Sequence, residues 1–156
     1  MSETGFKPAD TALLSPYLTV DGAARAVDWY GDVLGFHPLH RLESPDGRLM
    51  HAELRLDGQT LMVSDAWPEH GRSGPDGTNA PPVSLMLYVP DVDAAHARAL
   101  GAGATELMAP DDMFWGDRMA RFRDPFGHDW AVATHHRHVD AEELAAIMDQ
   151  MQAEDA

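Results

Sequence analysis

The chain has 156 residues, the length of one domain, of which 44% are hydrophobic, and its formal net charge is −15. So acidic a surface repels phosphate backbones, and we expect no nucleic-acid partner. The absence of cysteine excludes disulfides, thiol catalysis and thiolate metal ligands. No stretch reaches membrane-spanning length and residues 1–12 do not resemble a signal peptide, so we expect a cytoplasmic protein without membrane contact.

The first half of the chain predicts one strand, one helix and three further strands. A flexible lead-in over residues 1–12 precedes them. Helical periodicity predicts the helix, which Gly35 ends, and alternation predicts the strands. Asp57-Gly58 is the strongest hairpin signal in the chain. In chain order the elements are a strand over 14–20, a helix over 23–34, and strands over 36–43, 48–56 and 60–65.

The second half repeats this order. A segment over 66–82, rich in Gly, Pro, Asp and Asn, precedes it and predicts a linker or mobile loop. An amphipathic C-terminal helix over 140–152 follows it, with Leu144, Ile147 and Met151 on one face. The repeated elements are a strand over 83–89, a helix over 92–100, and strands over 104–108, 118–123 and 128–134.

The two halves are related by a constant offset. Val20 and Val89, which end the first strand of each half, and the turn glycines Gly58 and Gly127 are both separated by 69 residues. The duplication predicts one βαβββ unit over 13–65 and another over 83–135. A single unit leaves one sheet face exposed, so we expect an α+β fold in which tandem units form a half-open barrel with outer helices and a concave cavity.

Short phrases in both halves carry a family likeness. They are Pro16-Tyr-Leu-Thr-Val20, Ala26-Val-Asp-Trp-Tyr30 and His51-Ala-Glu-Leu-Arg-Leu-Asp-Gly58, then Trp115-Gly-Asp-Arg118, Asp124-Pro-Phe-Gly-His-Asp-Trp130 and Ala133-Thr-His135. Together with the repeat they resemble the vicinal oxygen chelate superfamily of glyoxalases, extradiol dioxygenases and bleomycin-resistance proteins, and its PhnB-like branch in particular. The resemblance covers about residues 13–151. It implies a single domain of this fold, commonly paired as a homodimer.

The resemblance also implies where a metal would be held. Metal-dependent members use a His or Gln in the first strand and a Glu in the last strand of each half. Those positions correspond to Ser15, Met62, Ser84 and Ala131, again related by the offset of 69. A divalent ion needs several His, carboxylate or Gln ligands at about 2.0–2.3 Å, which these residues do not supply. We therefore expect no metal and no cofactor.

Strand alternation predicts which side chains face the cavity. The predicted acid–base pair is His51 and Glu53, two residues apart on one strand face, although such a pair can also be a structural hydrogen bond. Met62 and Met86 can contact a ligand or simply fill a small barrel. The predicted ligand-binding residues are Tyr17, Met62, Met86, Tyr88, Arg121, Trp115 and His135.

Three further features of the second half also need interpretation. The loop around Trp115 is expected to be a lid, a dimer contact or a core plug. Asp117 and Arg118 are expected to form a structural turn pair, with substrate anchoring as the alternative. The histidines over 135–138 point in alternating directions, so we expect only adventitious metal binding there.

Two classes of function remain open from the sequence, together with a pure interaction role. The first is a metal-free protein that binds a small organic molecule, as the resemblance to bleomycin-resistance proteins implies. The second is a glyoxalase-like lyase or isomerase that uses His51 and Glu53, or an enzyme with a non-standard metal site. The absence of ligands at the four family positions favours the first class.

Overall fold

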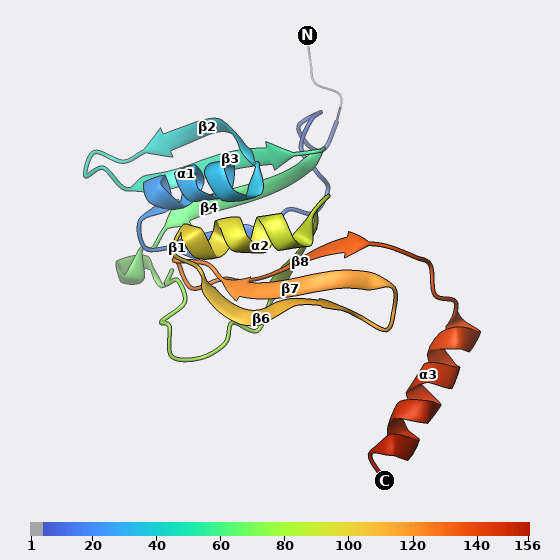
Figure 1. Cartoon of the computed structure of the whole chain (residues 1–156). Coiled ribbons are helices and arrows are strands. Elements are labelled where there is room, and N and C mark those ends of the chain that lie inside the picture. The colour runs from blue at the N-terminus through green and yellow to red at the C-terminus, as the bar shows by residue number, and fades with distance from the viewer. Residues whose placement is uncertain (1–4) are drawn as a thin grey trace. The chain divides into compact units, whose positions relative to one another are not determined.

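The computed structural model describes residues 5–156, and the chain divides into two compact units between Pro81 and Pro82. The first unit is a four-stranded sheet with one helix (Figure 1). Its strand order is β1-β4-β3-β2, in which β1 is parallel to β4 and the other pairs are antiparallel. The elements are β1 (Tyr17–Val20), α1 (Ala23–Leu34), β2 (His37–Glu43), β3 (Leu49–Leu56), β4 (Gln59–Asp65) and the short 3-10 helix η1 (Pro68–His70).

The second unit repeats the topology of the first, with the strand order β5-β8-β7-β6. The parallel strand pairs of the two units have the same register under the offset of 69, because Tyr17 pairs with Met62 and Met86 pairs with Ala131. The elements are β5 (Ser84–Tyr88), α2 (Val92–Gly101), β6 (Thr105–Asp112), β7 (Asp117–Arg123), β8 (Asp129–His135) and α3 (Ala141–Glu154). The predicted α+β fold of tandem βαβββ units is confirmed.

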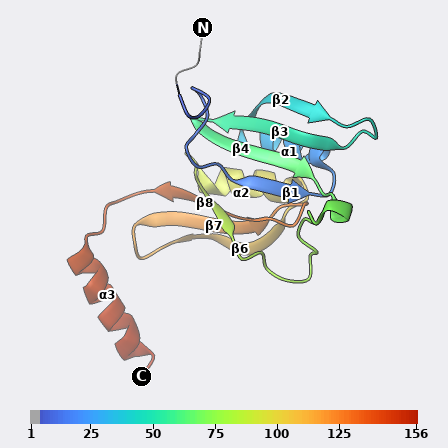
Figure 2. The same ribbon diagram turned by 180° about the vertical axis from the view of Figure 1, so that it is seen from behind.

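Each unit has its core between the helix and one face of the sheet. In the first unit, Leu18, Leu54 and Val63 turn toward α1 and are buried. The helix meets them with the buried side chains of Val27 and Tyr30. Burial of large apolar side chains contributes roughly 1.5–3 kcal/mol each, so these positions hold the sheet to its helix. The helix α1 lies behind the sheet in the rear view, so no helix in the described part of this unit covers the opposite face (Figure 2).

The start of α1 is held by a distant carboxylate. Its N-cap residue Gly22 has no side chain and a φ of 91°, so it cannot cap the helix itself. Asp65, at the end of β4, accepts hydrogen bonds at Oδ1 from the backbone N–H of Gly22 (3.0 Å) and Ala23 (2.9 Å). Its Oδ2 accepts from Leu49 N at 2.7 Å. One buried side chain thus ties together the starts of α1 and β3 and the end of β4.

A bulge interrupts the pairing of β2 with β3. Pro38 pairs with Leu54 and His40 pairs with Glu53, so Leu39 has no partner. The extra residue moves His40 to the face that Glu53 occupies, since side chains alternate along a strand. The second unit has a similar irregularity at Leu107, between Glu106 and Met108. It is not at the position equivalent to Leu39, which the offset of 69 places at Met108.

Two sequence expectations differ from the structure. Leu14 lies in the strand predicted over 14–20, but in the structure it falls outside the strand and is 87% exposed. The strand begins at Tyr17 because Pro16 has no N–H, and only its carbonyl joins the sheet, accepting from Met62 N at 2.9 Å. Asp117 and Arg118 do not pair with each other, since Arg118 binds Asp93 and Asp112 instead.

The helix α3 follows β8 as predicted, capped by Asp140, whose side chain accepts from Glu143 N at 2.8 Å. Among residues 5–156, no strand or other helix packs against it. Its apolar residues Met148 and Met151 are more than two-fifths exposed. In the described chain, none of the helices is both long and apolar enough to cross a membrane.

Candidate functional site

One row of side chains crosses the open face of the first sheet. Directly paired residues of neighbouring strands project to the same side, and the registers place Tyr17, Met62, Glu53 and His40 in line across β1, β4, β3 and β2. His51 lies two residues before Glu53 and shares its face. The open face therefore combines an aromatic ring, a thioether, two imidazoles and a carboxylate.

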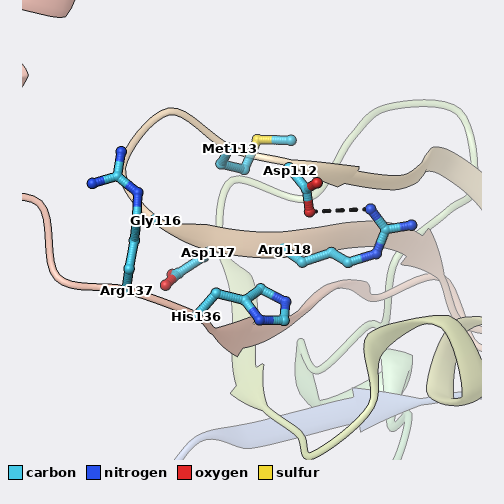
Figure 3. Close-up of a pocket in the computed structure, with 7 residues that line it drawn as sticks. All are labelled: Asp112, Met113, Gly116, Asp117, Arg118, His136 and Arg137. Atoms are coloured by element: carbon cyan, nitrogen blue, oxygen red, sulfur yellow. Dashed lines mark hydrogen bonds and ion pairs between the residues drawn. The ribbon is translucent and has the colours of Figure 1, made fainter.

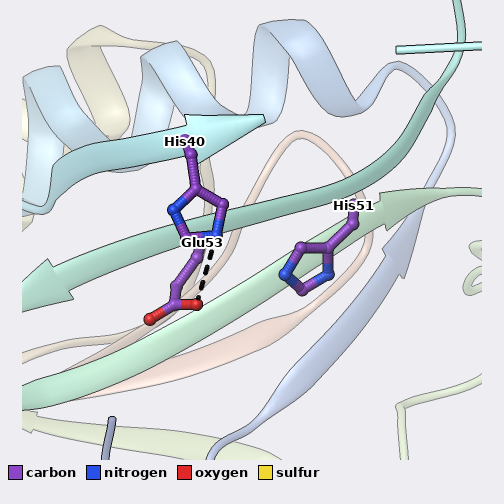
Figure 4. A group of neighbouring side chains, drawn as sticks. All are labelled: His40, His51 and Glu53. Atoms are coloured by element: carbon purple, nitrogen blue, oxygen red, sulfur yellow. Dashed lines mark ion pairs between the residues drawn. The ribbon is translucent and has the colours of Figure 1, made fainter. Parts of the chain in front are cut away.

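Hydrogen bonds organise this row into two linked pairs. Tyr17 Oη lies 2.6 Å from His51 Nδ1. Glu53 is buried, and its Oε2 lies 3.5 Å from His40 Nε2 while its Oε1 accepts from Arg55 Nη2 at 3.1 Å. Figure 4 shows His40, His51 and Glu53 projecting from neighbouring strands toward one another. The predicted pair of His51 and Glu53 thus lies in one cluster, but each residue has its own hydrogen-bond partner.

Along β4, the two residues that flank Met62 on the same sheet face are covered, whereas Met62 itself stays accessible. Thr60 is buried and accepts from Ala12 N at 3.2 Å. Ser64 is buried beneath Arg72, whose Nη2 donates to Ser64 Oγ at 3.1 Å. Met62, between them on the same strand face, is only partly covered. A ligand approaching this face therefore meets the surface around Met62, Tyr17 and the His–Glu cluster.

Part of the segment predicted as a linker packs on the first sheet. Trp67 and Arg72 form an isolated antiparallel bridge around η1. A Cβ at Gly74 would lie 2.8 Å from the carbonyl oxygen of Thr19, so the backbone can approach β1 this closely only with glycine. This contact fixes one side of the loop against the first strand. The mobility of the rest of 66–82 stays a prediction.

The loop forms a small pocket of about 260 Å³, lined by Met50, Trp67, His70 and Arg72. Arg72 links this pocket to the row, because its guanidinium lies 5.4 Å from the centre of the Tyr17 ring. Arg48 stacks at 3.5 Å over Trp67, which holds the indole in place. The lining has the mixture of aromatic, thioether and charged groups that small-molecule sites use.

In the second unit, the equivalent row is simpler. Met86, Ala131 and Arg121 pair across β5, β8 and β7. Met86 is 48% exposed and Arg121 is exposed as well. Ala131, the counterpart of Met62, contributes only a methyl group. This face presents a flexible thioether and a guanidinium without the His–Glu cluster of the first unit.

Three of the predicted ligand residues meet at Asp117. Its Oδ2 accepts from Tyr88 Oη at 2.9 Å, its Oδ1 lies 2.7 Å from His135 Nδ1, and the Trp115 side chain bonds to it as well. Burial alone would raise the pKa of Asp117, but the hydrogen bonds from His135 and Tyr88 outweigh it and leave the pKa below its ordinary value. The hydrogen bond between Tyr88 and Asp117 in turn raises the pKa of Tyr88. Asp117 is therefore a buried anion that orients three side chains.

A second pocket, of about 440 Å³, borders this anion (Figure 3). The Asp112–Arg118 ion pair of 3.1 Å lies in its wall. Gly116 lies against the Arg137 carbonyl with a φ of 99°, which leaves no space for a side chain there. The lining residues are Asp112, Met113, Gly116, Asp117, Arg118, His136 and Arg137.

The structure brings some predicted site residues together and adds others. Tyr17 and His51 are in contact, whereas Tyr88, Trp115 and His135 share one carboxylate. Over the described residues, the histidines at 135–138 do not bring three ligand atoms together. Sequence reasoning missed the side chains His40, Trp67 and Arg72, and it paired Asp117 with Arg118 rather than with Tyr88, Trp115 and His135. Trp67 and Arg72 could have been found, because an aromatic residue and an arginine are unusual in a flexible linker.

Comparisons with known proteins agree with this architecture. The family model described as "Glyoxalase/Bleomycin resistance protein/Dioxygenase superfamily" matches residues 11–132. The uncharacterised protein Rv0887c of Mycobacterium tuberculosis is 44% identical over 138 residues, covering 86% of this chain and 81% of that protein. YjdN of Escherichia coli is 26% identical over 142 residues, covering 76% of this chain and 92% of that protein.

Solved structures share the fold. TioX from Micromonospora sp. ML1 matches with a TM-score of 0.62 and 30% identity, covering 80% of this chain and 98% of TioX. PA1353 from Pseudomonas aeruginosa matches with a TM-score of 0.64 and 27% identity, covering 81% of this chain and all of PA1353. A PhnB protein from Bacillus cereus has the same fold at 16% identity and a TM-score of 0.64, covering 79% of this chain and 99% of that one.

Proposed function

The chain belongs to the glyoxalase/bleomycin resistance/dioxygenase superfamily, and on that basis we propose that it binds a small organic molecule without using the metal positions of the family. The open face around Tyr17 and Met62, with the adjoining pocket at Trp67 and Arg72, is the proposed binding surface. The observation that carries the proposal is the pocket itself, which places an indole, a thioether and a guanidinium beside an exposed phenol.

The residues at the family's metal positions do not fit a divalent ion. Ser15 Oγ is buried and has no hydrogen-bond partner, but a neutral hydroxyl is a poor ligand. Met62 supplies a thioether and Ala131 supplies no donor atom. Ser84 is exposed and again offers only a hydroxyl. The donor set differs from the two imidazoles and carboxylates that hold such ions, so no chemistry is assigned through a metal at these positions.

The charges on the first sheet indicate which ligands would fit. Glu53 is neutralised by Arg55, so it gives little attraction to an amine. Arg72 lines the pocket with a guanidinium, which favours a carboxylate or phenolate on the ligand. Tyr17 and Trp67 offer aromatic surface for a ring. We therefore expect an aromatic or amphipathic molecule with one anionic or polar group, small enough for a pocket of about 260 Å³.

A thermal-shift screen of small aromatic acids, followed by calorimetry on the hits, tests this proposal. Met62→Glu should weaken binding at least about tenfold, because the ligand would bury an unpaired carboxylate. Met148→Glu is the matched control, since Met148 lies on α3 and is 43% exposed. It should leave affinity unchanged. Equal affinity of Met62→Glu and the wild type for every hit would refute the assignment of this face.

The contact of Tyr17 with His51 favours one alternative function, proton transfer by a lyase or isomerase. A tyrosine hydroxyl at 2.6 Å can hold the imidazole in one orientation, as general bases require. His51→Ala separates the two readings. A binding protein should retain its ligand with a loss of about 1–2 kcal/mol. An enzyme that uses His51 as its base should lose at least about a hundredfold in turnover with little change in binding.

A further inference from the structure

We propose that His40, His51 and Glu53 form a site for a divalent transition ion of the zinc class, on the open face of the first sheet. The site lies apart from the four family positions and uses a residue, His40, that the bulge at Leu39 brings into register with Glu53. The proposal goes beyond the binding of an organic molecule and does not depend on it.

The first support is geometric. One possible ligand atom from each residue lies within 4.8 Å of the other two. Tetrahedral zinc with bonds of about 2.0–2.2 Å has its ligand atoms roughly 3.3–3.6 Å apart. The separation of 3.5 Å between His40 Nε2 and Glu53 Oε2 already matches that spacing. The other two separations lie within 4.8 Å, so they would have to close by at most about 1.5 Å, which requires rotation of the His51 as well as the His40 side chain.

The second support is the chemistry of the ligand set. Two imidazoles and one carboxylate are the protein ligands of several catalytic zinc sites, which leave a further position for water or substrate. Glu53 is 7% exposed, whereas His40 lies at the surface. The ion would therefore rest on a buried carboxylate and keep an open side. That side faces the same surface as Met62.

The third support is the set of outer contacts. Tyr17 Oη occupies Nδ1 of His51, so Nε2 is the nitrogen left for an ion. A metal-binding histidine usually donates its second ring N–H to an acceptor, and the hydroxyl oxygen of Tyr17 can take that role here. Arg55 occupies Oε1 of Glu53 and leaves Oε2 toward His40. The guanidinium also opposes a cation, so we expect weaker binding than at a closed structural zinc site.

The competing explanation is that His40 and Glu53 form only a surface ion pair. The two explanations differ in what a metal titration shows. Co²⁺ bound by four or five ligands gives strong visible absorption, and calorimetry with Zn²⁺ alone gives the stoichiometry. Both measurements use the full-length chain without an affinity tag.

The expected result is one ion per chain, with affinity reduced at least about 10–100-fold in His40→Ala and in Glu53→Gln, the range known for loss of even a supporting contact. His37→Ala is the matched control, because His37 lies on the same strand and pairs with Arg55 but falls outside the cluster. It should bind like the wild type. Thermal unfolding without metal shows whether each variant is folded, and the milder Glu53→Gln serves if His40→Ala is not.

The histidines at 136 and 138 provide the decisive comparison, because exposed tracts bind such ions adventitiously. The double variant His136→Ala/His138→Ala should retain the Co²⁺ spectrum and the Zn²⁺ affinity. Loss of binding in that variant with retention in His40→Ala would overturn the proposal. Absence of Co²⁺ or Zn²⁺ binding by the wild type, or equal losses in His37→Ala and His40→Ala, would overturn it as well.

Discussion

Replacing Asp117 by Asn removes the buried anion that holds three predicted ligand residues, while the shape of the side chain stays nearly the same. Asp117 is 4% exposed and accepts from Tyr88 at 2.9 Å and from His135 at 2.7 Å. An amide accepts at its oxygen and donates at its NH₂ group, so either Tyr88 or His135 would have to change from donor to acceptor. The substitution therefore replaces two hydrogen bonds to an anion by two neutral ones.

The cost follows from these two contacts. A hydrogen bond to a charged group contributes about 1.5–3 kcal/mol and a neutral one about 0.5–1.5 kcal/mol. Converting both bonds from charged to neutral should lower the free energy of unfolding at pH 7 by about 2 kcal/mol, at the low end of the range because His135 and Tyr88 are more than half exposed. Urea unfolding followed by tryptophan fluorescence measures this difference.

The pH dependence gives a second, sharper test. The pKa of Asp117 is lower in the folded chain than its ordinary value of 3.8. A depressed carboxyl pKa contributes stability that is fully present above the ordinary value and is lost as pH falls through the folded value. The stability advantage of the wild type over Asp117→Asn should therefore shrink as the pH falls below about 4.

Two outcomes would refute this reasoning. A stability difference below about 0.5 kcal/mol at pH 7 would mean that the hydrogen bonds at Asp117 contribute nothing net. A difference that stayed unchanged or grew as pH fell below 4 would mean that the folded pKa is not depressed. Asp32→Ala on the exposed side of α1 is the control, and it should show neither effect.

Two further predictions concern stability and assembly. Asp65→Ala should lower the free energy of unfolding by at least about 3 kcal/mol, because three backbone N–H groups lose a buried acceptor, and equal stability in urea would contradict this. We also expect a homodimer, since α3 leaves apolar side chains such as Met148 and Met151 uncovered. Light scattering at micromolar concentration checks it, and a monomeric mass would argue against it.

Much of the fold could be predicted because the same order of strand, helix and turn signals occurs in both halves of the chain. The offset of 69 residues carries over into the registers Tyr17 with Met62 and Met86 with Ala131. Alternation also places His51 and Glu53 on the face opposite Leu54, where the structure has them. Turn glycines and strand alternation are local signals, and local signals fix topology when they recur at a constant spacing.

The candidate site could be predicted only in part, because its remaining residues depend on contacts without a local signal. A strict alternation from His37 would place His40 opposite Ala52, on the core face, and the bulge at Leu39 reverses this. Arg72 reaches Tyr17 because a composition typical of linkers also permits the close approach of Gly74 to Thr19. Both features are decided by tertiary packing.

The most direct test of the proposed function uses the methionine methyl groups as reporters in an NMR titration. Met50 and Met62 lie at the proposed surface of the first unit, and Met148 and Met151 lie on α3, which belongs to the second unit. For a compound found by thermal shift, we predict saturable shifts of the Met50 and Met62 methyl signals and unchanged signals from Met148 and Met151. Saturable binding that shifts only the α3 methionines, or neither of the first pair, would contradict the account.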